Sequence, residues 1–221
     1  QCNPEYRRTR TVESLGMVYQ CHYPNRSMQT ARGAKRSPLH DRLAAQGAWF
    51  KDVSGWEGAD WYAGPHATPE PGPLTWGRPA FWDQWAAEHR ACREGVVVMD
   101  MSFMSKFRVQ GRDAGRVLDQ LSANAVDGDA ERITYTQWLN EGGTLEADLT
   151  VTKLDDGDFL VVATDTAHRH VETRLRRHAE AHHAFVTDVT SGFAQINVQG
   201  PRSRELLQSL TASDLSNARS E

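Results

Sequence analysis

The sequence has no apolar segment that could cross a membrane and no excess of basic residues. A membrane-spanning helix needs roughly 18 consecutive apolar residues, and no stretch of the 221 residues approaches that length. Lys and Arg number 25 against 29 Asp and Glu, so the net charge is −4, whereas a nucleic-acid partner favours a clearly basic surface. We therefore expect a cytoplasmic protein that has neither a membrane nor a nucleic acid as its partner.

Cysteine is scarce, and the histidines form no recognisable metal motif. The three cysteines, Cys2, Cys21 and Cys92, contain no C-x-x-C pair, and such a scattered set is typical of a reducing compartment. Among the nine histidines, His178 and His182 lie four residues apart, but no acid or cysteine completes a ligand set at a familiar spacing. We expect ordinary thiols and no metal site.

The common nucleotide and nucleophile motifs are also missing. The sequence contains neither G-x-G-x-x-G nor G-x-x-x-x-G-K-[ST], so it has no recognisable dinucleotide or nucleotide phosphate loop. No serine lies in a G-x-S-x-G turn, which leaves no basis for a hydrolase-type nucleophile.

A proline-rich segment divides the chain into two parts. Residues 62–79 hold five of the nine prolines, and such a stretch cannot continue a helix or a central strand. We place a first domain at 1–62, a linker at 63–79 and a second domain at 80–221. The first part has a short predicted helix at about 38–46 and then an irregular segment rich in aromatic residues. Roughly 60 residues bury only a marginal core, so these aromatics are expected to pack on the second part or on a neighbouring domain.

The second part predicts an α+β fold. Three strand-like stretches at 132–140, 144–154 and 158–165 are joined by the turns "EGG" and "DDGD", which indicates an antiparallel meander. Helices are predicted around it, one at 80–95, one from Asp113, one at 166–183 and one from Pro201 that buries Leu206, Leu207 and Leu210. Further strands are predicted at 96–102, 104–111 and 184–200. Helices alternating with antiparallel hairpins favour the α+β class.

The middle strand of the meander carries two acids where acids are uncommon. Because side chains alternate between the faces of a strand, Leu145, Ala147, Leu149 and Val151 are expected to share an apolar face. Glu146, Asp148, Thr150 and Thr152 are then expected to share the other. By pattern alone, that polar face is a solvent-exposed one.

Short motifs in a fixed order give this face another interpretation. They are "EHRACREGV", "DMSFMSKFRVQG", "YTQWLNE", "ADLTV", "DVTS" and "GPRSRELL". This series resembles the folate-binding fold of the glycine cleavage T-protein (aminomethyltransferase) superfamily, and within it the C-terminal half of dimethylglycine and sarcosine dehydrogenases or oxidases. "SPLHDRLAAQGAWF" and "GWEGADWYA" resemble the segment that connects the flavin domain to the folate domain in those enzymes.

The resemblance implies an N-methyl amine oxidoreductase. In such enzymes FAD in an upstream domain oxidises the amine, and the iminium passes to tetrahydrofolate, giving 5,10-methylenetetrahydrofolate. The sequence has no FAD fingerprint and ends before the later glutamate-containing folate segment of the family. We therefore expect a fragment, truncated at its C-terminus, whose first 62 residues are the end of the flavin protein's central domain. Alone it is expected to be inactive and to bind folate weakly or not at all, with the upstream flavin domain as its partner.

The resemblance also assigns the residues of a site. By position in the family, Asp148 lies next to the reactive amine of the folate and is the catalytic residue. Tyr135, Asn124 and Met101 would line the tetrahydrofolate pocket. Each has a structural alternative, because Tyr135 can be a core aromatic, Asn124 a helix C-cap and Met101 core filling. Glu146 is still expected to be a solvent-exposed acid without a role in the site.

A second function class stays open. The superfamily also includes folate-binding or regulatory proteins that keep the fold without catalysis. The presence of Asp148 favours the enzyme, and an upstream flavin domain in the parent gene would distinguish the two.

Overall fold

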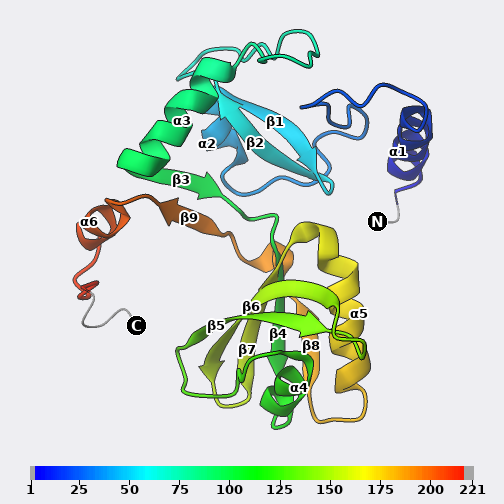
Figure 1. Cartoon of the computed structure of the whole chain (residues 1–221), viewed down its shortest axis with the longest axis vertical. Coiled ribbons are helices and arrows are strands. Elements are labelled where there is room, and N and C mark those ends of the chain that lie inside the picture. The colour runs from blue at the N-terminus through cyan, green and yellow to red at the C-terminus, as the bar shows by residue number, and fades with distance from the viewer. Residues whose placement is uncertain (1–2, 217–221) are drawn as a thin grey trace. The chain divides into compact units, whose positions relative to one another are not determined.

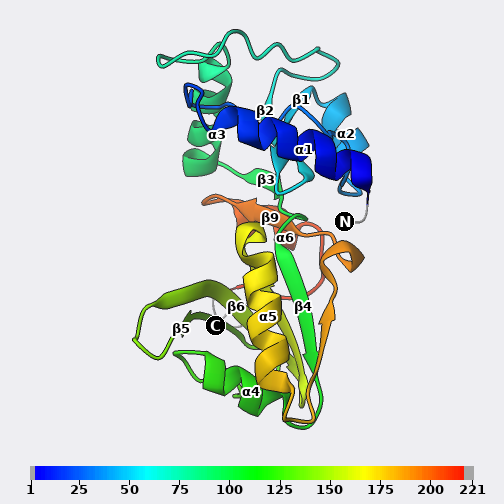
Figure 2. The ribbon, with the colours of Figure 1, turned by 90° about the vertical axis from the view of Figure 1, so that its right-hand side faces the viewer.

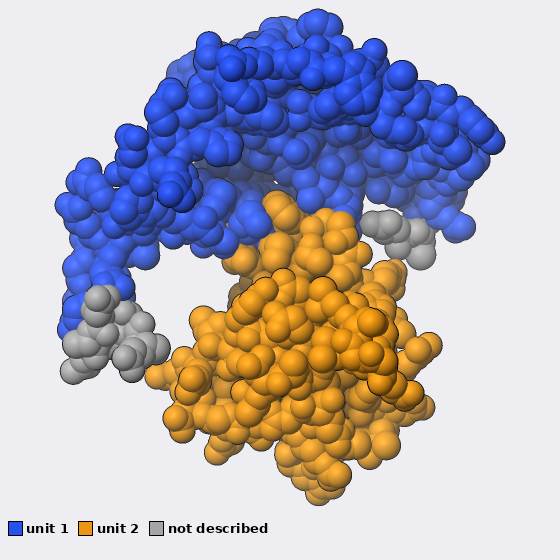
Figure 3. Space-filling model, in the orientation of Figure 1, with its two compact units in different colours: residues 1–101, 196–221 blue, residues 102–195 orange. Residues whose placement is uncertain are grey.

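The computed structural model describes residues 3–216 and contains two compact units (Figure 3). The first unit is residues 1–101 with 196–221, and the second is residues 102–195. The helices are α1 (Pro4–Met17), α2 (His40–Ala45), α3 (Trp82–Glu94), α4 (Ala114–Leu121), α5 (His168–Ala179) and α6 (Ser203–Gln208). The strands are β1 (Ala48–Val53), β2 (Trp56–Tyr62), β3 (Val97–Asp100), β4 (Ser105–Gln110), β5 (Ile133–Leu139), β6 (Leu145–Asp155), β7 (Asp158–Ala163), β8 (Phe185–Asp188) and β9 (Ile196–Gln199) (Figure 1).

The second unit is built on one five-stranded antiparallel sheet in the order β5-β6-β7-β4-β8. Strands β5, β6 and β7 follow one another as a meander, with each strand paired to the next. The tight turn between β6 and β7 contains Gly157, whose φ of 69° suits glycine. The predicted α+β class and its antiparallel meander are therefore confirmed.

Helices α4 and α5 supply the core on one face of this sheet (Figure 2). Helix α5 turns Val171, Leu175 and Ala179 inward at a spacing of four residues, which places them on one side of the helix. The fully buried side chains of the unit include Phe107, Val109, Val117, Leu118, Trp138, Val151, Phe159 and Val161. The side chains that alternate with these core residues point to the opposite face of the sheet. Among the described residues of this unit, no helix covers that face (Figure 2).

A β-bulge separates the two acids of β6. The register passes from Trp138↔Ala147 to Leu139↔Leu145, so Glu146 is the extra residue. Its carboxylate contacts His170 and Arg174 of α5, on the helix side. The expectation that Glu146 and Asp148 share one face is therefore wrong. Leu145, expected in the core, is 61% exposed for the same reason.

The first unit contains a β-hairpin in the segment that was predicted to be irregular. Strands β1 and β2 pair through a two-residue turn at Ser54 and Gly55, both of which have positive φ (50° and 88°). Two-residue turns of this kind match the twist of antiparallel strands. The sequence signal for this turn was the dipeptide Ser-Gly between apolar residues. It was missed because the segment is so rich in tryptophan.

The aromatic residues of the hairpin pack on α3, within the second predicted part of the chain. The ring of Trp61 lies 6.5 Å from that of Trp49 and 4.9 Å from that of Phe81, measured between centroids. Phe81, which precedes α3, contacts Trp85 edge-on at 4.8 Å. Trp61 is only 2% exposed, so this stack is the centre of the hairpin's packing.

Helix α1 was not predicted, although its start carries two standard signals. Asn3 caps it by accepting hydrogen bonds from the backbone N–H groups of Glu5 and Tyr6 at 3.0 and 3.1 Å. Pro4 is the first helical residue, where a missing N–H costs nothing. The helix is tied to the hairpin by an ion pair between Arg10 and Asp52 at 3.0 Å.

The last predicted strand and helix need correction. The stretch 184–200 forms two strands in different sheets, because β8 pairs with β4 whereas β9 pairs with β3. Helix α6 begins at Ser203, and the leucines predicted to be buried are exposed by 40% at Leu206, 38% at Leu207 and 75% at Leu210. No described element covers these three side chains.

Candidate functional site

Asp148 projects from the middle of β6 on the sheet face that α4 and α5 leave uncovered. Its neighbours Ala147 and Leu149 are buried on the helix side, so alternation directs Asp148 away from it. Gln137 of β5 lies directly opposite in the register. The Gln137 side-chain Nε2 donates a hydrogen bond to Asp148 Oδ1 at 3.2 Å.

Tyr135 joins this pair from the same face of β5. The Asp148 carboxylate accepts a hydrogen bond from the Tyr135 phenol, which raises the pKa of Tyr135 above its ordinary value of 10.0, and the charge of Asp148 adds to the effect. A hydrogen bond from Gln137 acts on the Tyr135 pKa in the opposite direction. The Tyr135 side chain is 62% exposed, so it is not the core aromatic that was considered as an alternative.

Gln137, Asp148 and Tyr135 form one hydrogen-bonded group at the surface of the sheet, the Asp148 group. A carboxylate that accepts from two neutral donors retains lone pairs for a third partner. Gln137 was not predicted as part of the site. The register of the hairpin was the signal that could have found it, since pairing across the "NEGG" turn sets Gln137 opposite Asp148.

Asn124 lies beside the edge of β5. Its backbone N–H donates to Thr136 Oγ1 at 3.2 Å, and the N–H of Ala123 donates to the Gln137 carbonyl at 2.9 Å. The C-cap residue of α4 is Ser122, so the interpretation of Asn124 as that cap is wrong. The Asn124 side chain is exposed and, among the described residues, forms no hydrogen bond with the Asp148 group.

Met101 belongs to the first unit, where it directly follows β3 and is half-buried. The other three predicted site residues belong to the second unit. Within the second unit, the structure brings Tyr135 and Asp148 together.

Glu146 occupies a separate polar cluster on the helix side. Asn140 donates to it at 3.1 Å, His170 Nε2 lies 2.6 Å from its carboxylate and Arg174 lies 3.5 Å away. The hydrogen bond from Asn140, followed by His170 and the charge of Arg174, lowers the pKa of Glu146. An open hollow of about 700 Å³ lies beside this cluster, lined by Leu139, Asn140 and Arg174 among others. This hollow is thus on the side of the sheet opposite Asp148.

A serine, a histidine and an aspartate also meet in this unit. His168 Nδ1 lies 2.9 Å from Ser105 Oγ, and His168 Nε2 lies 3.2 Å from Asp188. Ser105 is fully buried and donates to the Thr164 carbonyl at 3.3 Å. A buried hydroxyl with a backbone partner cannot meet a substrate, so this chain of contacts fastens α5 to β4 and β8.

Within residues 3–216, no three His, Cys, Asp or Glu side chains are placed to share a metal ion. In the same residues, no helix combines the length and the apolar character needed to cross a bilayer.

Comparison with known proteins decides the family. Residues 39–221 match the family described as the GCVT N-terminal domain. The chain belongs to this family. Residues 1–37 match the central domain of FAD-dependent oxidoreductases. The GCVT domain thus begins on the N-terminal side of the proline-rich segment in this comparison, and the boundaries proposed at residues 62 and 79 remain predictions.

Several curated relatives of the chain are much longer than the chain itself. It is 41% identical over 216 residues to 4-methylaminobutanoate oxidase (formaldehyde-forming) of Paenarthrobacter nicotinovorans, covering 98% of this chain and 26% of the relative. It is 29% identical to the mitochondrial pyruvate dehydrogenase phosphatase regulatory subunit of Mus musculus, covering 96% and 25%. It is also 29% identical to mitochondrial sarcosine dehydrogenase of Homo sapiens, covering 97% and 28%. The chain spans about a quarter of the length of these relatives.

A solved structure confirms the fold. The aminomethyltransferase T of the glycine cleavage system from Bartonella henselae superposes with a TM-score of 0.62 at 22% identity, covering 80% of this chain and 43% of that one. The GCVT chain therefore has the T-protein fold that its motifs predicted.

Proposed function

We propose that the chain is the folate-binding, one-carbon-transfer module of an FAD-dependent N-methyl amine oxidoreductase of the dimethylglycine or sarcosine type. In this proposal the parent enzyme forms 5,10-methylenetetrahydrofolate. The observation that carries it is the Asp148 group on the uncovered sheet face. The 41% identity to an oxidase of a methylamino acid supports the substrate class.

The donor set suits tetrahydrofolate. Its pterin presents both N–H donors and acceptors at its edge, and the amide of Gln137 and the phenol of Tyr135 offer both functions. The carboxylate of Asp148 is the one acidic group of the set and suits an amine N–H. Asn124 and Met101 remain proposed pocket residues, with Asn124 as a further amide for the pterin edge and Met101 as an apolar wall.

Each residue of the Asp148 group has a definite task. Tetrahydrofolate, when bound, supplies the amine nitrogens that take up a one-carbon unit. Asp148 accepts the proton that such a nitrogen loses, and its charge stabilises a cationic iminium substrate. Gln137 holds one carboxylate oxygen and so fixes the direction of the other. Tyr135 donates a hydrogen bond to the carboxylate and so helps to hold it in place.

The test uses the full-length parent enzyme and separates amine oxidation from folate coupling. Asp148→Asn removes the proton acceptor and the charge but keeps the shape of the side chain. We expect reduction of an electron-accepting dye by the amine to be unchanged, and the yield of methylenetetrahydrofolate to fall by about 100-fold, as for loss of a general base. Formaldehyde, measured in parallel, should account for the one-carbon units that are not transferred.

Glu146→Gln is the matched control. It makes the same chemical change two residues away, but on a carboxylate that contacts α5. Its methylenetetrahydrofolate yield should stay near that of the unaltered enzyme. An unchanged yield in Asp148→Asn would remove Asp148 from the reaction.

A second candidate is a regulatory role without catalysis. The similarity to a phosphatase regulatory subunit over 96% of the chain favours it. A regulatory parent protein should neither reduce the dye in the presence of N-methyl amines nor produce formaldehyde or methylenetetrahydrofolate.

A further inference from the structure

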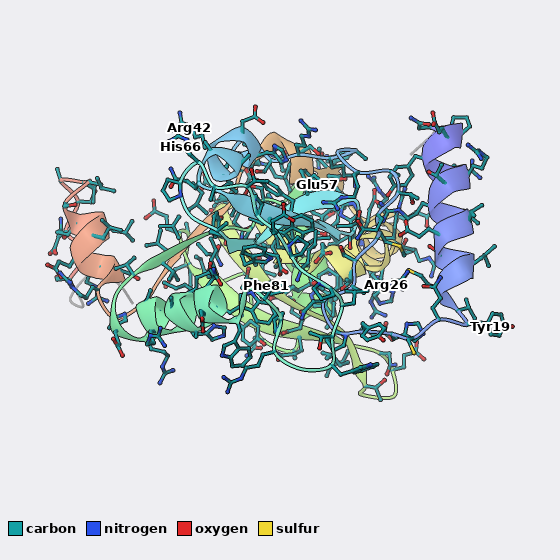
Figure 4. All side chains as sticks on the ribbon, turned by 90° about the horizontal axis from the view of Figure 1, so that it is seen from above. Tyr19, Arg26, Arg42, Glu57, His66 and Phe81 are labelled. Atoms are coloured by element: carbon teal, nitrogen blue, oxygen red, sulfur yellow. The ribbon has the colours of Figure 1, made fainter. Side chains whose placement is uncertain are left out.

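The first unit contains a second hollow, far from the Asp148 group in sequence. Its volume is about 340 Å³, within the range of roughly 300–1,000 Å³ found for small-molecule sites. It is lined by residues of three segments, namely the loop after α1, the β1–β2 hairpin and the proline-rich segment with Phe81. Figure 4 labels Arg26 and Phe81, which belong to the first and last of these.

Two aromatic rings form apolar walls of this hollow. Trp49 and Phe81 both line it, and both stack on Trp61, with interplanar angles of 24° and 7°. Trp61 is 2% exposed and therefore holds the two rings in fixed orientations. Flat, fixed aromatic surfaces complement a planar apolar ligand.

One lining residue of the hollow, Arg26, is a cation. Arg26 is half-buried, and among residues 3–216 no carboxylate or side-chain oxygen pairs with it. The other charged lining residue, Asp60, is neutralised by an ion pair with Lys51. A guanidinium held partly out of water without a counter-charge favours an anion, which it can bind through two parallel hydrogen bonds.

We propose that this hollow binds a small organic anion with a planar aromatic body, whose carboxylate pairs with Arg26 and whose ring packs against Trp49 and Phe81. Aromatic walls beside a carboxylate would otherwise suit an organic cation, but Lys51 already holds Asp60. The proposal is independent of the function proposed for Asp148, because it concerns other residues in the other unit.

The experiment titrates the 221-residue chain with benzoate and, separately, with benzamide, its neutral counterpart. Backbone and indole N–H signals are followed by two-dimensional NMR. At about 10 mM, which saturates a site of millimolar affinity, benzoate should shift the indole signals of Trp49 and Trp61. Trp138, which is fully buried in the second unit, should not move. Benzamide should bind about tenfold more weakly.

Three variants test whether Arg26 supplies the positive charge that binds benzoate. Arg26→Gln should weaken benzoate binding about tenfold and leave benzamide binding unchanged, and Arg26→Lys should restore part of the loss. Arg78→Gln is the control, because Arg78 is exposed in the proline-rich segment and stacks over Trp82 without lining the hollow. It should change the affinity by less than about twofold. The proposal fails if benzoate shifts neither indole signal, if benzamide binds as tightly as benzoate, or if Arg26→Gln and Arg78→Gln behave alike.

Discussion

The pairing of Asp148 with Tyr135 has a consequence for the pH dependence of the second unit. The carboxylate raises the pKa of Tyr135 above 10.0 through a hydrogen bond and its charge. A group whose pKa is raised on folding contributes stability that is present below its ordinary pKa and is lost as the pH rises through its raised value. Tyr135 should therefore weaken the fold only above pH 10.

Asp148→Asn should lower the pKa of Tyr135 toward its ordinary value, because it removes the negative charge that opposes phenolate formation. The measurement is a pH titration of the labelled tyrosine ring carbon by NMR. Glu146→Gln should leave the Tyr135 titration unchanged, since Glu146 contacts α5. If both variants shift Tyr135 equally, the effect is one of overall charge and the hydrogen bond is not its cause.

At the scale of residues, the family resemblance, and not the strand pattern, pointed to Asp148 and Tyr135, whose role in the site stays a prediction. Neither the resemblance nor the pattern pointed to Gln137 or to the separation of Glu146. Alternation correctly placed Ala147, Leu149 and Val151 in the core. It failed at Glu146 because a bulge adds one residue to one strand, and a period of two cannot detect it. Finding Gln137 required the register between two strands, which depends on the turn as well as on the pattern.

Among the elements, the tight approach of β4 to the loop before β8 depends on a glycine. Gly111 has a φ of 129°, and a Cβ placed there would lie 2.2 Å from the carbonyl oxygen of His183. Gly143, in the β5–β6 turn, also has a positive φ of 76°, but a Cβ there would meet nothing within 4 Å. Comparing the two glycines therefore separates the cost of a positive φ from the cost of a steric clash.

Gly143→Ala should lower the free energy of unfolding by about 1 kcal/mol, the cost of a left-handed conformation for alanine. Gly111→Ala should cost about 3 kcal/mol or more, because His183 and its neighbours must also move away from the end of β4. Urea unfolding of the two variants measures the difference. Equal costs would show that the loop before β8 yields freely and that the contact at Gly111 does not constrain it.

Elements with strong local signals were predicted, and those that depend on distant partners were not. The helix from Asp113 has an apolar side visible at a spacing of three and four residues, and α4 begins at Ala114. The stretch 184–200 has the composition of one strand, yet its halves pair with β4 and β3, which lie far apart in the sequence. The apolar side of α6 predicted burial, but no described element covers it. A local pattern indicates which side chains of a segment can be buried. It does not indicate which other segment of the chain covers them.

Over the whole molecule, motif order predicted the family, whereas composition did not predict the spatial division. The proline-rich segment, chosen as a linker because it cannot form regular structure, lies within the first compact unit and contacts the hairpin around the second hollow. The first unit instead gains β9 and α6 from the far end of the chain. Such a discontinuous unit has no signature in composition, because its two pieces are separated in the sequence by the 94 residues of the second unit.

The second unit, in contrast, is a continuous segment with a complete core. Every buried side chain of its main cluster comes from residues 102–195, and its two ends are joined by a hydrogen bond from the Gln195 N–H to Ser102 Oγ at 3.1 Å. We expect the isolated segment 102–195 to fold and to unfold in one cooperative transition, as domains of this size do. Leu175→Ala, at a fully buried position of α5, should cost it about 3 kcal/mol.

Urea unfolding and NMR of the isolated segment test this expectation. The matched measurement in the 221-residue chain is Leu206→Ala, which truncates a leucine that is 40% exposed and should change the free energy of unfolding by less than about 0.5 kcal/mol. A segment 102–195 without dispersed NMR signals would mean that its core closes only with help from the rest of the chain. The Asp148 group would then owe its geometry to both units, because a sheet that does not form alone cannot by itself hold Gln137 opposite Asp148.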